Sequence, residues 1–344
     1  MSDPIASVVM ITYNHREYIS QAIECVLRQE TDFPFELVIG EDCSTDGTRD
    51  IVFDYHRRYP DIVRVVTSER NAGMNANVLR TERACRGKYI AYCEGDDYWH
   101  NPHKLRMQVH YLEHNPHYGM VHSDVDVEYV ARNQVIRAFQ RTIGADYTGE
   151  DDQFLRILEG RYRIYTCTVC AKKDLIDTVT NHNPELRDCR FLMGDKPRWL
   201  EVSRLVPIGY LPDSLATYRV VPESATNSRN ASKRVAFARS SLEMHAHYCS
   251  KYSVPDATRK IALRSQYSQL LRLAFVADDM ALAREARSGI ASVGIRLTPS
   301  QALEYYSVRL RALAPLARAS LKLYKNVSLN RHIHRWIVKQ CCRQ

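Results

Sequence analysis

Short apolar runs alternate with amphipathic segments along the first 130 residues. The apolar runs are rich in β-branched residues and predict buried strands at residues 7–12, 35–40, 62–67 and 89–93. Helical spacing of apolar residues predicts helices between them, within residues 18–29, 44–58 and 75–85. We expect Thr45 or Asp46 to cap the second helix and Gly87 to end the third. Strands separated by such helices indicate an α/β fold class: a mainly parallel, Rossmann-like sheet flanked by helices.

The pattern becomes less regular beyond residue 120. Further strands are expected at residues 120–130 and 164–171, and a helix at 195–202. From about residue 235 the signal is helical, and it is divided by Pro255, Pro299 and Pro315. We therefore expect one α/β domain over residues 1–228, followed by a helical C-terminal region over residues 229–344.

Polar clusters follow the first four predicted strands. They begin at Thr12, Glu41, Asn71 and Glu94. Each cluster alone could be a turn, because Asn, Asp, Ser and Gly are turn formers. Four clusters at successive ends of parallel strands face one edge of the sheet, which is where α/β sheets bind ligands. The arrangement therefore favours a ligand site over four unrelated turns.

The cluster after the fourth strand contains adjacent carboxylates, Asp96 and Asp97. Two such groups at a buried strand end repel each other, and a divalent cation with hard oxygen ligands offsets that cost. The sequence has neither a GxxxxGK[ST] loop nor a GxGxxG turn to hold phosphates. A nucleoside diphosphate held through Mn²⁺ or Mg²⁺ fits the residues that are present.

Four segments together resemble the family 2 glycosyltransferases, which have a GT-A fold. They read VVMITYN, ELVIGEDCSTDGT, ERNAGMNAN and YIAYCEGDDYW. A later segment, YLPDSLATYRVVPES, is similar to the end of the catalytic domain in bacterial members that build surface polysaccharides. The resemblance covers roughly residues 5–225. It implies a nucleotide-binding half at about residues 1–130 and an acceptor half at about 131–228.

The resemblance implies a role for each polar cluster. The residues implied in nucleotide-sugar binding are Thr12, Tyr13, Asn14, Asp42, Asn71, Asp96, Trp99 and Arg219. Asp42 is expected to accept a hydrogen bond from the base, most naturally from uracil N3–H, and Asp97 is expected to ligate the metal. Trp99 is expected to shape the sugar and acceptor side, with core packing as the alternative.

An inverting transfer needs a general base near the acceptor hydroxyl. The resemblance points to Asp195, at the start of the predicted 195–202 helix, with a helix cap as the alternative role and Asp188 as the reserve candidate. The sequence departs from the family here, because the usual Glu-Asp pair is Gly-Asp. It departs again at Val221, where relatives often carry a histidine. Arg219 remains available for the pyrophosphate, or as a structural ion-pair partner.

The leading hypothesis is an inverting glycosyltransferase that moves a sugar from a UDP-sugar to a glycan or lipid-linked acceptor in surface polysaccharide biosynthesis. Two alternatives remain open. A nucleotidyltransferase that forms sugar nucleotides also uses an α/β sheet and carboxylate-bound Mg²⁺, although it would want a Gly-rich basic loop where this chain has TYNHREY. A non-catalytic scaffold that binds sugar nucleotides would tolerate both departures from the family pattern.

The net charge of +8 is concentrated in the tail. Residues 305–344 carry nine Lys and Arg and no acidic residue, whereas the other 39 basic residues balance 40 acidic ones. The balance over residues 1–304 argues against a nucleic-acid partner. The basic and apolar tail favours an anionic membrane surface, with packing on the protein or on another subunit as the alternative.

The sequence also suggests a compartment. It shows no signal peptide and no apolar run long enough for a membrane span, and its ten cysteines are not dense enough for a disulfide framework. Cys167 and Cys170 form a CxxC that we interpret as part of a strand. We expect free thiols and a cytoplasmic protein, peripheral to the inner face of the membrane if the tail binds lipid.

Overall fold

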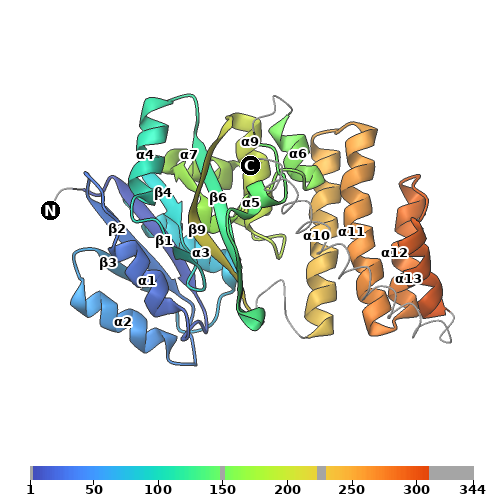
Figure 1. Cartoon of the computed structure of the whole chain (residues 1–344), viewed down its shortest axis with the longest axis horizontal. Helices are drawn as coiled ribbons and strands as arrows, with labels where there is room; N and C mark the ends of the chain where they lie inside the picture. Colours follow the sequence, from blue (N-terminus) through green and yellow to red (C-terminus); the bar gives the residue numbers. More distant parts are fainter. Residues whose placement is uncertain (1–2, 148–151, 223–229, 310–344) are drawn as a thin grey trace, which may run out of the picture. The chain divides into compact units, whose positions relative to one another are not determined.

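The computed structural model describes residues 3–147, 152–222 and 230–309 (Figure 1). The chain divides into two compact units, residues 1–224 and residues 225–344. The first unit contains all the strands of the described residues, and the described part of the second has helices as its only regular elements. Each unit is treated by itself below.

The first unit is built around one sheet. Its strands are β1 (Ala6–Thr12), β2 (Phe35–Glu41), β3 (Val63–Thr67), β4 (Tyr89–Tyr92), β5 (Tyr98–Trp99), β6 (Met120–Tyr129), β7 (Gln134–Ile136), β8 (Cys170–Lys172) and β9 (Ile208–Val220). They lie in the order β3-β2-β1-β4-β8-β6-β9-β5, and β7 pairs with β6. The pairs β3–β2, β2–β1, β1–β4 and β6–β9 are parallel. Their carboxyl ends therefore share an edge, as the alternating pattern of the sequence requires.

Helices connect and cover these strands. Those of the first unit are α1 (Ile19–Leu27), α2 (Thr48–Arg58), α3 (Met74–Ala84), α4 (Lys104–His114), α5 (Phe139–Thr142), α6 (Gln153–Glu159), α7 (Lys173–His182), α8 (Pro184–Arg187) and α9 (Asp195–Leu205). The central strand β1 has almost no exposed side chain because neighbours cover both of its faces. α1 turns one apolar face inward through Ile19, Ile23 and Val26, each with no exposed area. Burial of each such side chain stabilises the fold by about 1.5–3 kcal/mol. The expected α/β architecture is confirmed.

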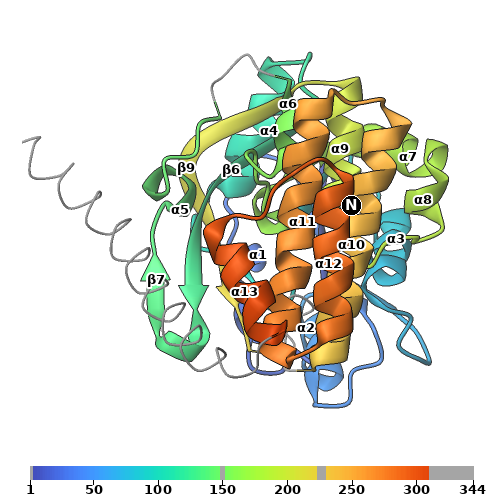
Figure 2. The same cartoon turned by 90° about the vertical axis from the view of Figure 1, so that its right-hand side faces the viewer.

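The second unit is helical. Its described helices are α10 (Ala231–Lys251), α11 (Asp256–Ala277), α12 (Met280–Ser292) and α13 (Pro299–Arg309), seen side by side in Figure 2. They enclose their own apolar core, which includes Leu270, Leu271 and Ile290. None of the helices in the described ranges is both long and apolar enough to cross a bilayer.

Three local expectations were wrong. Residues 164–171 are not a continuous strand, since Thr166–Thr168 form a 3₁₀ turn before the short β8. The residue preceding α2 is Gly47, in a left-handed conformation, although Asp46 does accept a hydrogen bond from the Thr48 amide at 2.9 Å. Gly87 does not cap α3: a side chain there would lie 2.6 Å from the Ala6 and Ser7 backbone, so the glycine allows two segments to approach closely.

Candidate active site

The polar loops meet at the carboxyl edge of the sheet, as their positions after parallel strands predict. The Asp42 amide donates to Thr12 O at 3.1 Å, which joins the β2 loop to β1. The Gly95 amide donates to Ile11 O at 2.9 Å, which joins the β4 loop to the same strand. A Cβ on Gly95 would lie 2.7 Å from Thr12 Oγ1, so only glycine permits this contact.

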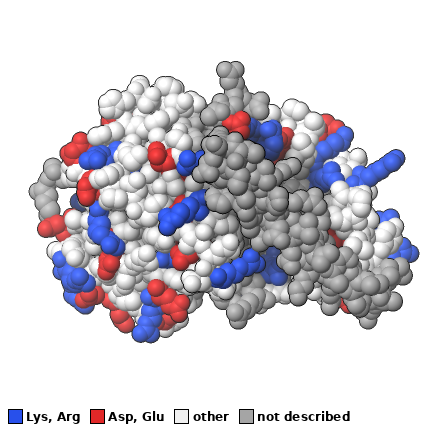
Figure 3. Space-filling view, in the orientation of Figure 1, with Lys and Arg blue, Asp and Glu red and all other residues white. Residues whose placement is uncertain are grey.

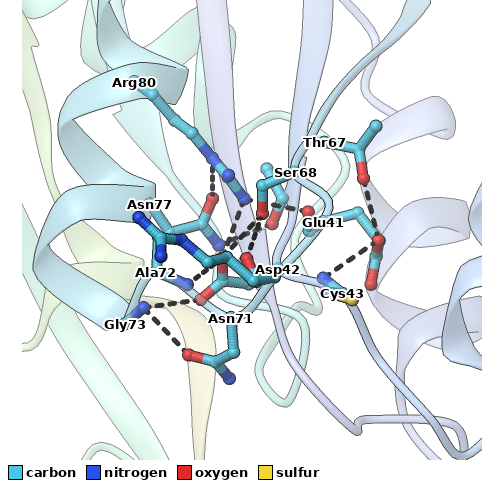
Figure 4. A network of polar contacts seen from close by, with 12 residues as sticks. Glu41, Asp42, Cys43, Thr67, Ser68, Asn71, Ala72, Gly73, Asn77 and Arg80 are labelled. Carbon is cyan, nitrogen blue, oxygen red and sulfur yellow. Dashed lines mark hydrogen bonds and ion pairs between the residues drawn. The ribbon is translucent and has the colours of Figure 1, made fainter.

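Asp42 organises the loop that follows β3 (Figure 4). Its carboxylate is buried and accepts hydrogen bonds from the Ala72 and Gly73 amides at 3.0 and 2.9 Å. Arg80, from α3, donates to the same carboxylate at 3.0 Å. Asn71 adds to the turn by accepting from the Gly73 amide at 2.9 Å. Asp42 therefore holds the loop that the sequence assigned to the nucleotide, and it has protein partners on both oxygens.

Glu41 is a second buried acid in this network, and the sequence analysis gave it no role. Its carboxylate has no exposed area and accepts from the Cys43 and Ser44 amides at 3.2 and 2.6 Å. It also accepts from Thr67 Oγ1 at 3.1 Å, across the strand pair. A carboxylate at the end of a buried strand, directly before a polar loop, is the signal that could have indicated this role. Glu41 shapes the loop that carries Ser44 to Thr48.

The residues after β1 differ in exposure. Thr12 is buried, and its Oγ1 lies 3.3 Å from His15 Nδ1. Tyr13 is 41% exposed, so its ring is accessible to a ligand. Asn14 adopts a left-handed conformation, with φ of 56°, and its Oδ1 accepts from the Thr45 amide at 2.8 Å. These contacts leave Tyr13 as the side chain of the segment with an open face.

The three acids after β4 face different surroundings. Asp97 is 3% exposed, and its Oδ1 accepts from the Arg219 amide at 2.8 Å. Asp96 is partly exposed, with Oδ2 3.9 Å from His15 Nε2. Within the described residues, Glu94 Oε2 is buried without a hydrogen-bond partner. Asp96 is thus more accessible to a ligand than Asp97, the residue that the sequence analysis assigned to the metal.

These carboxylates perturb one another. Burial, and then the charges of Asp96 and Glu94, raise the pKa of Asp97 well above its usual range. Burial raises the pKa of Glu94 to about 8, and the nearby charges of Asp96 and Asp195 add to the shift. Mutual repulsion and an unpaired oxygen are features of a site that a cation would stabilise. The residues therefore fit a divalent ion, although within the described ranges no set of three His, Cys, Asp or Glu side chains is arranged to hold one unaided.

Arg219 and Trp99 are both embedded in the protein. The Arg219 guanidinium is 6% exposed; it pairs with Glu128 at 3.1 Å and donates to Asp96 O at 3.1 Å. Its charged end also lies 4.4 Å from the Tyr98 ring centroid. The Trp99 indole N–H donates to the Tyr92 and Cys167 carbonyls at 3.2 and 2.9 Å. Arg219 thus makes an internal ion pair and Trp99 packs in the core, which are the contacts that the alternative roles require.

Asp195 opens α9 and lies within electrostatic range of Glu94. Its Oδ2 accepts from Thr166 Oγ1 at 3.4 Å, and its Oδ1 accepts from the adjacent Lys196 amide. The residue that caps α9 is Gly194, so Asp195 belongs to the first turn. Asp188, the reserve candidate, is instead exposed and paired with Arg187 at 2.9 Å.

A buried ion pair joins α9 to the nucleotide half. Arg198 Nη1 lies 2.7 Å from Glu82 Oε1 on α3, and Tyr92 OH donates to the same oxygen at 2.7 Å. Asn75 Nδ2 donates to Phe191 O at 2.6 Å near the start of both helices. Together these contacts position the helix that carries Asp195. Sequence spacing offered no signal for the Arg198–Glu82 and Asn75–Phe191 contacts, because the partners in each lie 116 residues apart.

Comparison with known proteins identifies the family. Residues 7–176 match the model "Glycosyl transferase family 2". An uncharacterised protein of Mycobacterium tuberculosis is 46% identical over 110 residues, 32% of each chain. The putative teichuronic acid biosynthesis glycosyltransferase TuaG of Bacillus subtilis is 35% identical over 109 residues, 32% of this chain and 42% of TuaG. The match thus spans only about a third to two fifths of these curated relatives.

Solved structures show the same fold. Staphylococcus aureus TarS superposes with a TM-score of 0.56 at 17% identity, over 88% of this chain and 55% of TarS. The mannosyltransferase PcManGT from Pyrobaculum calidifontis, solved with GDP-Man and Mn²⁺, superposes with a TM-score of 0.54 at 16% identity, over 92% of this chain and 87% of its own. At these identities the likeness establishes the GT-A architecture of the first unit.

Proposed function

We propose that this chain, which belongs to glycosyl transferase family 2, transfers a sugar from a nucleoside-diphosphate donor to a hydroxyl group with inversion. The observation that carries the proposal is the convergence of carboxylates at one edge of the sheet. Asp42 follows β2, Asp96 follows β4, and Asp195 begins α9, within electrostatic range of Glu94. These carboxylates would join a donor site and a base in one cluster.

The donor would lie over the loops after β1, β2 and β3, with UDP as the preferred nucleoside diphosphate. Tyr13 offers an exposed ring, and Asn14 and Asn71 shape the loops beneath it. The Asp42 carboxylate has about four lone-pair sites and already accepts from the Ala72 and Gly73 amides, Arg80 and Ser68 Oγ. To read uracil N3–H it would exchange the longest of these hydrogen bonds, the one from Ser68 at 3.3 Å. A TarS fragment of similar fold was solved with UDP, and PcManGT with GDP-Man, which supports a nucleoside-diphosphate donor.

Glu94 and Asp96 are the residues that would hold Mn²⁺ or Mg²⁺, with Asp97 behind them. The orphaned Glu94 oxygen and the accessible Asp96 carboxylate motivate this choice. A bound divalent ion would neutralise charge on the donor diphosphate. Arg219 positions this loop with two hydrogen bonds. Its guanidinium donates to the Asp96 carbonyl, and its backbone amide donates to the Asp97 carboxylate.

Asp195 would act as the general base. The Thr166 hydroxyl orients its Oδ2, and Asp195 would accept the proton of the acceptor hydroxyl as that hydroxyl attacks. The bond from the acceptor oxygen to the anomeric carbon forms as the bond to the diphosphate breaks. Attack from the opposite face inverts the anomeric configuration.

The acceptor is proposed to be a glycan or lipid-linked glycan of a surface polysaccharide. The relative TuaG is described as a putative teichuronic acid biosynthesis glycosyltransferase, which supports this acceptor class. Another relative, the putative glycosyltransferase EpsE of Bacillus subtilis, is 34% identical to this chain over 120 residues. A sugar-nucleotide-forming nucleotidyltransferase and a non-catalytic scaffold are the competing functions. Release of pyrophosphate from a nucleoside triphosphate and sugar phosphate would favour the first.

The test is a screen of UDP-, GDP- and dTDP-sugars with Mn²⁺, read by thermal shift and by release of nucleoside diphosphate. A donor bound only by the native state raises apparent stability by RT ln(1 + [L]/Kd). We expect a UDP-sugar to give the largest shift, to need Mn²⁺ or Mg²⁺, and to be slowly hydrolysed. Binding without any turnover in the presence of metal would support the scaffold instead.

The tail is proposed to hold the enzyme on an anionic membrane surface at the cytoplasmic face. Residues 310–344 lie outside the described residues, so the proposal rests on the nine basic residues of the sequence. On the first unit, by contrast, acidic and basic side chains are interspersed over the face shown in Figure 3. Co-sedimentation with anionic liposomes should separate the full chain from one ending near Leu303. Equal binding by the two would instead favour packing of the tail on protein or between subunits.

A further inference from the structure

A small cavity lies in the acceptor half of the first unit. It has a volume of about 150 Å³ and lies between α5 with the loop after it and the segment that follows α6. A cavity of this size accommodates one six-membered ring. Nothing in the family motifs of the sequence pointed to it.

The walls have the chemistry of a sugar subsite. Phe139, Tyr147 and Tyr165 provide aromatic surface, against which the C–H face of a pyranose can pack. Gln140 also lines the cavity and is 1% exposed. Within the described residues its Oε1 is buried and has no hydrogen-bond partner. An unsatisfied buried acceptor costs about 1–3 kcal/mol, and a ligand hydroxyl would satisfy it.

The described walls of the cavity carry charge of one sign. Among the residues that the structure describes, Arg161 and Arg163 line the cavity and no Asp or Glu does. Arg161 pairs with Glu159 at 2.5 Å, which partly neutralises it. Arg163 is exposed and makes no ion pair with a carboxylate in the described ranges. A guanidinium binds carboxylate or phosphate oxygens through two parallel hydrogen bonds, which favours an anionic substituent on the ring.

Tyr165 connects the cavity through the chain to a partner of the candidate base. Tyr165 precedes Thr166, whose hydroxyl donates to Asp195 Oδ2 at 3.4 Å. The Tyr165 ring also packs against Tyr218, 5.2 Å between centroids, immediately before Arg219. One wall of the cavity is therefore next in the chain to a residue that binds the candidate base.

We propose that this cavity is the acceptor subsite and that it selects a pyranose carrying a negative charge, either a carboxylate or a phosphate. The inference rests on the proposed function, because it names the acceptor class of that same site. Gln140 accepts from a ring hydroxyl, the aromatic side chains pack on the ring, and Arg163 pairs with the anion.

The experiment measures binding of small probes to the full chain by ligand-observed NMR. Methyl β-glucuronide and glucose 6-phosphate carry the two anions, and methyl β-glucoside is the uncharged match. We expect at least one anionic probe to bind roughly tenfold more tightly than the glucoside. Tighter binding of methyl β-glucuronide identifies a uronate acceptor, and tighter binding of glucose 6-phosphate identifies a phosphorylated acceptor. Equal binding of all three probes, or binding of none, overturns the proposal.

Variants locate the binding. Arg163→Gln should remove the preference for the anion, whereas Arg57→Gln, on the exposed face of α2, should keep it. Ala145→Phe, which fills the cavity, should abolish binding of all three probes. The thermal shift with UDP and Mn²⁺ should stay unchanged in each variant, because the donor loops are untouched. Retained probe binding in Ala145→Phe refutes the site, while absence of any UDP shift in the unmodified protein refutes the proposed function separately.

Discussion

Removal of one partner of the Arg198–Glu82 ion pair should destabilise the first unit strongly. The two side chains are 7% and 4% exposed, and their charged atoms lie 2.7 Å apart. Glu82→Leu leaves the buried Arg198 guanidinium without a counter-charge. Arg198→Leu likewise leaves the buried Glu82 carboxylate without one. Loss of one partner of such a pair costs about 3–5 kcal/mol of unfolding free energy.

The double variant should behave differently. Burial raises the pKa of Glu82 even though Arg198 lies beside it, so desolvation of the carboxylate outweighs the attraction within the pair. Replacement of both residues by Leu removes the two desolvation costs together, and such replacements are often neutral or stabilising. We expect the double variant to be more stable than either single variant.

The assay is urea denaturation followed by tryptophan fluorescence. Trp199 reports directly, since its ring lies 5.9 Å from that of Tyr92, which donates to Glu82. The control is Asp54→Leu, which breaks an exposed pair with Arg57 and should cost at most about 1 kcal/mol. If the double variant loses as much as the two single losses combined, the pair is not coupled and the reasoning fails.

Three further predictions concern the site. Asp195→Asn should keep the thermal shift with UDP while transfer falls by a hundredfold or more, and Asp188→Asn should leave turnover unchanged; near-normal turnover of the first variant would remove Asp195 as the base. The folded-state pKa of Glu94 is raised from 4.5 to about 8, so its contribution to stability is full below pH 4.5 and is lost as the pH rises through 8. In the metal-free protein, Glu94→Gln should therefore flatten the plot of unfolding free energy against pH between those values. Parallel plots for the variant and the unmodified protein would contradict this. Gly95→Ala should weaken donor binding about tenfold or more by displacing Thr12, as titration with UDP and Mn²⁺ would reveal; unchanged affinity would mean that the loop does not contact the donor.

Much of the first half of the fold could be predicted, because each strand there is a local apolar run bounded by turn residues. The expected strand at residues 35–40, for example, is Phe35–Glu41 in the structure. The strand prediction for residues 164–171 failed because the apolar residues there, including Cys167, are buried by packing against the rest of the fold while the backbone forms a turn. Apolar content alone does not distinguish a buried strand from a buried turn.

The site could be predicted in outline only. Motif positions placed the acids at one edge, but they did not distinguish the accessible Asp96 from the buried Asp97. That difference depends on the Arg219 amide, 122 residues away in the sequence. The internal partners of Arg219 and the unsatisfied oxygen of Gln140 likewise depend on which segments meet in space.

The strand β9 has a consequence for how the protein is made. Its 13 residues run beside β6, and its end supplies the amide that binds Asp97. Asp97 and Arg219 are 122 residues apart, so a long segment of chain must close before the carboxylate cluster is complete. Such non-local pairing slows folding. On the ribosome the donor loops emerge long before β9, at about 5–20 residues per second. Nascent chains that stop before residue 219 should therefore leave Asp97 without its partner, and full donor binding should appear only once β9 has been synthesised.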